Sequence, residues 1–340
     1  MILSTQTDFL GRAYGEAEAI RMLAKAGFDA YDFSFFPMFE NPEYPINGPD
    51  FREYAQSLRA VAEEAGIACN QAHAPFASST GDPEDDGRRF KAIVRSMEAA
   101  SILGAKVIVV HPKHHLPYIT HAAELQKMNE EFYKRLVPYC EKFGIKAACE
   151  NMWQENPVAN RIIDSACSRP QEFCAYIDQT DSPWIVGCLD VGHTALTDED
   201  LGGFIRAMGP KRLQALHVHD NDFLEDSHTM PFTCKIDFSA LVTALKEIGY
   251  EGDFTLTANA YMRFRQAEHS VYGMFSPCRG FPTQKTHVLD KKTVFAIFQT
   301  SPRRYCLNSS KTNCAPQAFI CNFRAKPPAG MKPGRWLFLS

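Results

Sequence analysis

Residues of the metal-binding type follow strand-like apolar segments at a nearly constant spacing in this sequence. His73 and His111 are 38 positions apart, His111 and Glu150 are 39 apart, and Glu150 and Asp190 are 40 apart. This period fits one strand, one helix and their connections. Because the polar residue always follows the strand, the pattern predicts parallel strands that are joined by helical crossovers.

Eight apolar segments alternate with longer, mostly amphipathic segments over residues 1–260. The predicted strands are 2–4, 30–35, 68–73, 107–111, 147–150, 185–190, 213–218 and 254–256. The predicted helices include 16–26, 51–65, 88–103, 122–143, 204–208 and 238–248. Eight strand–helix units predict a closed (β/α)₈ TIM barrel, an α/β fold. The alternative, an open doubly wound sheet, would need a glycine-rich phosphate turn after its first strand, and the sequence has none.

The charge distribution changes near residue 268. Residues 269–340 hold eleven Lys and Arg and one acidic residue, whereas residues 1–268 carry a net charge of −14 within a total of −4. Segments 276–282 and 326–333 are rich in turn residues, and no amphipathic helix follows the eighth strand. We therefore expect a barrel domain over 1–265 and a basic, Cys- and Pro-containing tail over 266–340. The tail is expected to be irregular and poorly ordered, with an incomplete or atypical eighth helix.

The cellular location and the redox state of the cysteines are expected to be those of a large cytosolic domain. No apolar run approaches the ~18 residues of a membrane helix, and the N-terminus lacks the features of a signal peptide, so we expect a cytoplasmic protein without a membrane partner. The 11 cysteines include no Cys-x-x-Cys pair. We expect them to be reduced, with Cys69, Cys149 and Cys188 packed in the core.

Histidines and carboxylates collect at the predicted strand ends, which meet at one rim of a barrel. The candidates are His73, His111, Glu150, Asp190, His193, His217 and His219, with Asp226 and His228 on the following loop. Such a mixture suits Mn, Zn, Co, Fe or Mg. A single histidine is more often a hydrogen-bonded core or loop residue. A carboxylate that ends an apolar run, as Glu150 does, needs a partner or an ion.

A further cluster, Lys113, His114 and His115, follows the fourth predicted strand. Its ordinary interpretation is a solvated loop. The alternative is that Lys113 contacts an anionic substrate.

At these residues the chain resembles the xylose-isomerase-like TIM-barrel superfamily, which groups sugar and sugar phosphate isomerases and epimerases with endonuclease IV. The resemblance covers about residues 1–265. It rests on the ordered motifs His-Ala-Pro-Phe, Val-His-Pro, Cys-Glu-Asn, Leu-Asp-Val-Gly-His and His-Val-His-Asp-Asn-Asp. In the epimerases a divalent ion is held by a Glu, an Asp, a His and a Glu after strands five to eight. The resemblance implies Glu150, Asp190 and His217 as the first three ligands, and Thr257 stands where the last Glu is expected.

This resemblance implies a divalent-metal-dependent isomerase or epimerase that acts on a sugar or sugar phosphate and needs no nucleotide cofactor. Protons would move at a carbon next to a carbonyl, with Glu150 as the catalytic residue on one face. With Thr257, a ligand and the second acid/base group are both missing, so the activity of this copy is open. We expect His217 to be the ligand and His219 to lie further out, near substrate or solvent. Members of this superfamily are often oligomeric, which makes a homo-oligomer an expectation.

Two alternatives remain from the sequence. The endonuclease IV branch uses three zinc ions, and its ligand pattern is similar here at His73, His111, Glu150, Asp190, His193, His217, Asp226 and His228. The charge of −14 over residues 1–268 argues against it, because a DNA-binding surface should neutralise phosphates, so a nucleic acid partner is not favoured. The other alternative is an inactive, sugar-binding or relic barrel, which Thr257 would explain.

Overall fold

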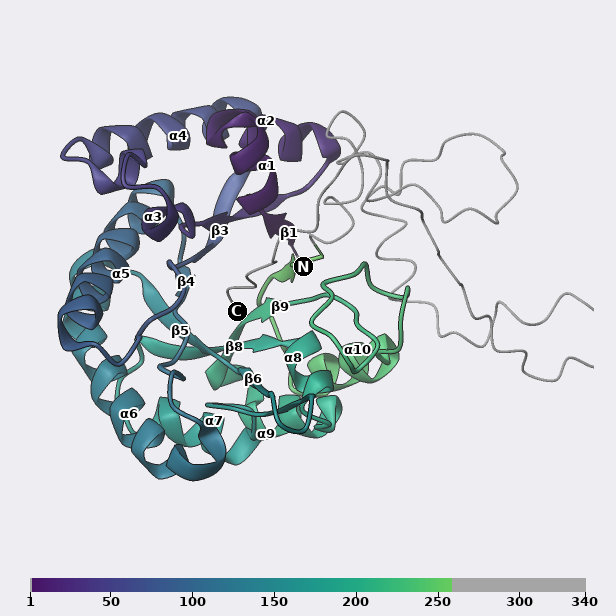
Figure 1. Cartoon of the computed structure of the whole chain (residues 1–340). Helices are drawn as coiled ribbons and strands as arrows, with labels where there is room; N and C mark the ends of the chain where they lie inside the picture. Colours follow the sequence, from purple (N-terminus) through teal and green to yellow (C-terminus); the bar gives the residue numbers. More distant parts are fainter. Residues whose placement is uncertain (1, 259–340) are drawn as a thin grey trace, which may run out of the picture. The chain divides into compact units, whose positions relative to one another are not determined.

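The computed structural model describes residues 2–258, which form an eight-stranded parallel barrel with helices on its outer side (Figure 1). The strands are β1 (Leu3–Gln6), β2 (Ala30–Ser34), β3 (Ala68–His73), β4 (Val107–Val109), β5 (Lys146–Glu150), β8 (Ile185–Asp190), β9 (Leu213–His217) and β10 (Phe254–Leu256). Their order around the sheet is β10-β1-β2-β3-β4-β5-β8-β9. The barrel closes between β9 and β10, the two ends of this order, through residues just beyond β9. The Val218 amide donates to the Thr255 carbonyl (2.9 Å), and the Thr257 amide donates to the Val218 carbonyl (3.0 Å).

Helices connect successive strands on the outside of the barrel (Figure 1). They are α1 (Asp8–Tyr14), α2 (Glu16–Ala26), α3 (Pro37–Glu40), α4 (Phe51–Ala65), α5 (Pro83–Leu103), α6 (Tyr118–Phe143), α7 (Pro170–Asp178), α8 (Val191–Leu196), α9 (Leu201–Arg212) and α10 (Phe238–Glu247), with a 3₁₀ helix η1 (Pro45–Asn47). An antiparallel hairpin, β6 (Trp153–Asn156) and β7 (Arg161–Asp164), leaves the barrel after β5. No helix among these described elements is long and apolar enough to cross a membrane.

The core has two parts with different composition. The larger part lies between the helices and the strands and contains large side chains such as Tyr31, Phe33 and Phe204. The part inside the barrel is small, with Val109, Ala148, Val186, Cys188 and Ala215. Small interior residues leave space at the strand ends. The polar side chains that follow them can therefore meet there, as the barrel interior permits.

The predicted barrel is confirmed, and several element boundaries agree with the sequence analysis. Strands β3, β8 and β10 and helices α2 and α4 have the predicted bounds. Gly66 and Gly104 end α4 and α5 with φ of 72° and 103°, the left-handed conformation that glycine adopts without steric cost. The β6–β7 hairpin and α8 were not predicted. The boundary at 265/266 and the expectations for the tail lie outside the described residues and stay predictions.

Candidate metal centre

Four of the predicted site residues form a buried inner cluster at the barrel mouth: His73, His111, Glu150 and His217. Glu150 ends β5, and its Oε1 lies 2.7 Å from His217 Nδ1 at the end of β9. Its Oε2 lies 3.1 Å from His111 Nε2 and 3.6 Å from His73 Nε2. One carboxylate is thus surrounded by three imidazoles that come from three different strand ends.

Asp190 links this inner cluster to a second group of residues. It ends β8, and its Oδ2 lies 4.0 Å from His217 Nδ1. Its Oδ1 lies 2.9 Å from His219 Nε2 and also accepts the His193 amide at 2.8 Å, which caps the N-terminus of α8. Donor atoms of Glu150, Asp190 and His193 lie within 4.8 Å of one another. The convergence of Glu150, Asp190 and His217 is therefore as the sequence predicted, although the assignment of ligands is not tested by it.

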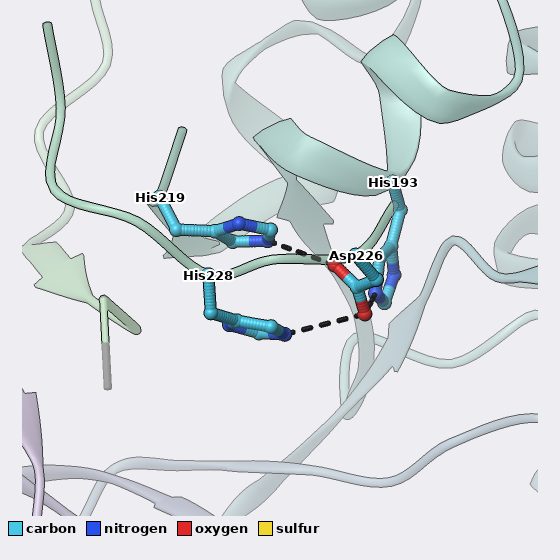
Figure 2. A group of neighbouring side chains, drawn as sticks. All are labelled: His193, His219, Asp226 and His228. Atoms are coloured by element: carbon cyan, nitrogen blue, oxygen red, sulfur yellow. Dashed lines mark hydrogen bonds and ion pairs between the residues drawn. The ribbon is translucent and has the colours of Figure 1, made fainter. Parts of the chain in front are cut away.

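The outer cluster consists of His193, His219, Asp226 and His228, which Figure 2 shows converging on the Asp226 carboxylate. Asp226 Oδ2 lies 3.3 Å from His193 Nε2 and 3.3 Å from His228 Nε2, and Oδ1 lies 3.7 Å from His219 Nε2. The rings of His219 and His228 are stacked with centroids 3.9 Å apart. Each of the four can offer one donor atom within 4.8 Å of the others.

The loop that carries Asp226 and His228 is organised by Asp220. The Asp220 carboxylate accepts the amides of Cys234, Lys235 and Ile236 at 2.8–3.1 Å. Its backbone pairs with Thr229 in both directions. Asp220 therefore shapes the loop, and its oxygens are committed to backbone amides.

Backbone carbonyls fix the orientation of three histidines. His73 Nδ1 donates to the Ala74 carbonyl (3.0 Å), His193 Nδ1 to the Asn151 carbonyl (2.7 Å) and His228 Nδ1 to the Thr257 carbonyl (2.8 Å). Because a carbonyl only accepts, Nδ1 of each ring carries a proton, and Nε2 faces the carboxylates as the nitrogen that would bind an ion. Metal-binding histidines are commonly oriented in this way.

The charges of the site depend on these pairs. Burial raises the pKa of Glu150, but the neighbouring His217 and His111 outweigh it and hold that pKa well below its usual value. Burial lowers the pKa of His111 to about 4 despite Glu150. Burial opposes protonation of His193 too, yet Asp190 and Asp226 raise its pKa to about 10. The carboxylates are therefore ionised around neutral pH.

The donor set fits a divalent ion. Glu150 Oε2 and Asp226 Oδ1 are buried without a hydrogen-bond partner, and a buried carboxylate oxygen without one is costly. The surrounding imidazole nitrogens and carboxylate oxygens are ligand types that Zn, Mn, Co and Fe accept. Cys188 Sγ also lies within 4.8 Å of donor atoms of Glu150 and His217.

Three residues lie in surroundings that differ from those the sequence indicated. His219 does not lie toward solvent but is completely buried, because its ring packs against the Asp190 carboxylate and stacks on the His228 ring. Lys113 is paired with Asp86 (3.2 Å) and lies over the Phe132 ring, so its charge is already compensated. Thr257 is buried with an Oγ1 that has no hydrogen-bond partner.

The supposed basic cluster after β4 is less basic than expected. Burial lowers the pKa of His114 to about 4, so this ring is neutral, and it stacks on Phe76 at 5.6 Å. His115 contacts Ser79 Oγ at 2.6 Å. An anion would find little free positive charge at these two side chains.

Several residues of the site escaped the sequence analysis. The Asn151 side chain donates to the Asp190 carbonyl and accepts a hydrogen bond from the Asp190 amide, and the Asn151 carbonyl accepts one from His193 Nδ1. The Trp153 indole donates to Asp226 Oδ2 (3.3 Å). Asp32 and Gln71 lie beside His217 inside the barrel. Asp32 was recognisable as an acid that interrupts the apolar run 30–35. The role of Trp153 depends on the unpredicted hairpin and left no signal.

The fold and the arrangement of acidic and histidine residues define a TIM barrel of a known type. The model of the xylose isomerase-like TIM barrel family matches residues 20–270. The chain belongs to this family, as its motifs had indicated.

The chain is similar to proteins with different printed activities. The chain is 22% identical to a D-psicose 3-epimerase of Ruminiclostridium cellulolyticum over 70% of this chain and 76% of that one. It is 26% identical to a probable endonuclease 4 of Campylobacter concisus over 49% of this chain and 61% of that one. A crystal structure of the IOLI protein with a bound zinc atom superimposes with a TM-score of 0.63 at 18% identity, covering 81% of this chain and 95% of that one. Neighbours of both the sugar epimerase and the endonuclease type therefore share this barrel.

Proposed function

We propose that the protein is a divalent-metal-dependent isomerase or epimerase of a sugar or sugar phosphate. The observation that carries the proposal is the position of Glu150, whose carboxylate is buried at the barrel mouth within 2.7 Å of His217 and adjacent to Asp190. Similarity to the D-psicose 3-epimerase supports the substrate class, and the zinc atom of the similar IOLI structure supports the metal.

Glu150, Asp190 and His217 would hold the ion, with the other cluster histidines as additional ligands or substrate contacts. A divalent ion at this position supplies Lewis acidity that polarises a carbonyl oxygen. Glu150 is ionised, since His217 and His111 lower its pKa. It can therefore accept the proton from the carbon next to the substrate carbonyl and return it later.

Epimerisation needs a second proton-transfer group on the opposite face of the substrate carbon. Thr257 occupies the place of the family's strand-eight glutamate, and a hydroxyl is a poor base at neutral pH. Glu150 is therefore the one acid/base residue assigned here, and Thr257 supplies no second one.

The test is proton exchange on candidate ketoses in deuterated solvent, together with metal analysis of the purified protein. Deuterium at a carbon next to the carbonyl, lost when the metal is removed and restored when it is added back, supports the proposal. Absence of exchange on both free and phosphorylated ketoses, with the metal bound, would contradict it.

A zinc-dependent endonuclease is the second candidate, and the outer cluster is the observation that favours it. His193, His219, Asp226 and His228 form a second potential ion site, and several ions suit the hydrolysis of phosphodiesters. Cleavage of DNA that contains abasic sites would support this candidate. A protein that shows neither exchange nor cleavage while remaining folded would instead be an inactive barrel.

A further inference from the structure

Asp32 lies beside the inner cluster and has no place in the chemistry described so far. It is on β2, is completely buried, and its Oδ2 accepts a hydrogen bond from Gln71 Nε2 at 3.2 Å. The same Oδ2 lies 3.6 Å from His217 Nε2, while Oδ1 has no hydrogen-bond partner. A buried carboxylate with so little compensation is costly and needs a nearby positive charge or donor.

His217 lies between two carboxylates. Its Nδ1 faces Glu150 Oε1 (2.7 Å), and its Nε2 faces Asp32 and the amide nitrogen of Gln71 (3.0 Å). A neutral imidazole has one N–H and one lone pair, so only one of its two nitrogens can bind an ion. If Nδ1 is to bind an ion together with Glu150 and Asp190, the ring proton must be on Nε2.

The two groups at Nε2 have opposite effects on this choice. The Gln71 amide nitrogen donates, which favours an unprotonated Nε2 and leaves the proton on Nδ1, where it blocks the ion. The Asp32 carboxylate only accepts, and therefore favours a protonated Nε2. Asp32 is thus the neighbour that stabilises the form of His217 whose Nδ1 lone pair is free.

We propose that Asp32 is a positioning residue that holds the ring proton of His217 on Nε2 and so directs Nδ1 toward the ion. The inference rests on the proposed metal site of Glu150, Asp190 and His217. Partners of this kind, a carboxylate behind a metal-binding histidine, typically change metal affinity by about 10–100-fold when they are removed.

The experiment measures zinc binding at His217 in the full-length chain. The ¹⁵N signals of the His217 ring, assigned with His217→Gln, report both the protonated nitrogen and occupancy by zinc in chelator-buffered solutions. The test variant is Asp32→Asn, which keeps the shape but can donate to Nε2. The matched control is Asp253→Asn, which makes the same change before β10, at the other end of the strands, where Asp253 accepts from Asn70 (2.9 Å).

We expect zinc-loaded wild-type protein to show a protonated Nε2 on His217. Asp32→Asn should weaken zinc binding there by about 10–100-fold, while Asp253→Asn leaves it within about twofold of wild type. A protonated Nδ1 in the loaded wild type would overturn the inference, and this measurement does not depend on the folding of a variant. Equal zinc affinity in wild type and Asp32→Asn would overturn it as well.

The same data separate the inference from the proposed function. If zinc leaves the His217 signals unchanged in the wild-type protein, the metal site itself is wrong. If zinc binds at His217 and only the Asp32→Asn result fails, the metal site stands and the role of Asp32 is refuted.

Discussion

Two buried glutamates show how differently one side chain can behave in this molecule. Glu16 begins α2 and accepts hydrogen bonds from the Tyr44 and Tyr54 hydroxyls. Glu150 ends β5 among imidazoles. Burial raises the pKa of both, and at Glu16 the neutral tyrosines do not offset it, so that pKa is raised. At Glu150 the imidazoles reverse the shift and lower the pKa well below its usual value.

This difference indicates that burial alone does not identify a functional carboxylate. Glu16 has a hydroxyl donor on each oxygen and is complete without any further group. Glu150 keeps an Oε2 without a hydrogen-bond partner next to two imidazole nitrogens. The second environment is typical of a site that receives an ion.

The difference between Glu150 and Glu16 is tested most directly by removing the charge of Glu150. Glu150→Gln keeps the shape but removes a metal ligand and the proton acceptor, so ketose proton exchange should fall by about 10²–10⁴-fold. The inner cluster should also lose its metal, measured by elemental analysis. Glu16→Gln is the matched control and should retain both metal and exchange. Retention of exchange in Glu150→Gln would remove Glu150 from the catalytic role.

Adding a carboxylate at Thr257 is the reverse experiment, because it should increase proton exchange where Glu150→Gln decreases it. Thr257→Glu places an acid where the resemblance to the epimerases implies one, beside the pair formed by the Thr257 carbonyl and His228. If a missing acid/base group limits this protein, exchange should rise by about 10²-fold, the lower end of such effects. Thr257→Gln has a similar size and no charge, and should give no increase. An equal result for the two variants would show that Thr257 does not limit activity.

A substitution at Asp226 shows whether this carboxylate belongs to an ion site, as is proposed for Glu150, or is complete without an ion, as Glu16 is. Burial raises its pKa, but His228 and His193 lower it well below the usual value, as the imidazoles do at Glu150. We expect Asp226→Asn to weaken a second bound zinc by about 10-fold or more while the inner ion remains. Zinc stoichiometry in buffered metal measures this. Loss of both ions, or an unchanged stoichiometry, would contradict two separable sites.

The sequence predicted the barrel and the convergence of most candidate residues, because both depend on local regularities. Strand ends such as Glu150 and Asp190 stand at a fixed period, and parallel strands bring such ends together. Contacts across the barrel have no such signal. His219 is buried by Asp190 at the end of β8 and by His228 on the loop after β9, and Trp153 reaches Asp226 only because a hairpin follows β5.

The smallest expected effect concerns Glu16 itself and its dependence on pH. Because burial raises its pKa in the folded protein, the folded state binds the proton more tightly than the unfolded chain does. The stabilisation from this proton is complete below the ordinary carboxyl pKa of 4.5 and is lost as the pH rises through the raised value. At neutral pH the buried charge then destabilises the fold, whereas Glu16→Gln never carries that charge.

We expect Glu16→Gln to melt at a higher temperature than wild type at neutral pH, with the difference shrinking or reversing toward pH 4.5. Thermal melts of both proteins across this range measure the trend, with Glu64→Gln on the exposed side of α4 as control. A melting difference that does not change with pH would show that folding leaves the pKa of Glu16 unshifted. A wild type that gains stability over Glu16→Gln as the pH rises would show that the tyrosines stabilise the ionised carboxylate, as the imidazoles do at Glu150.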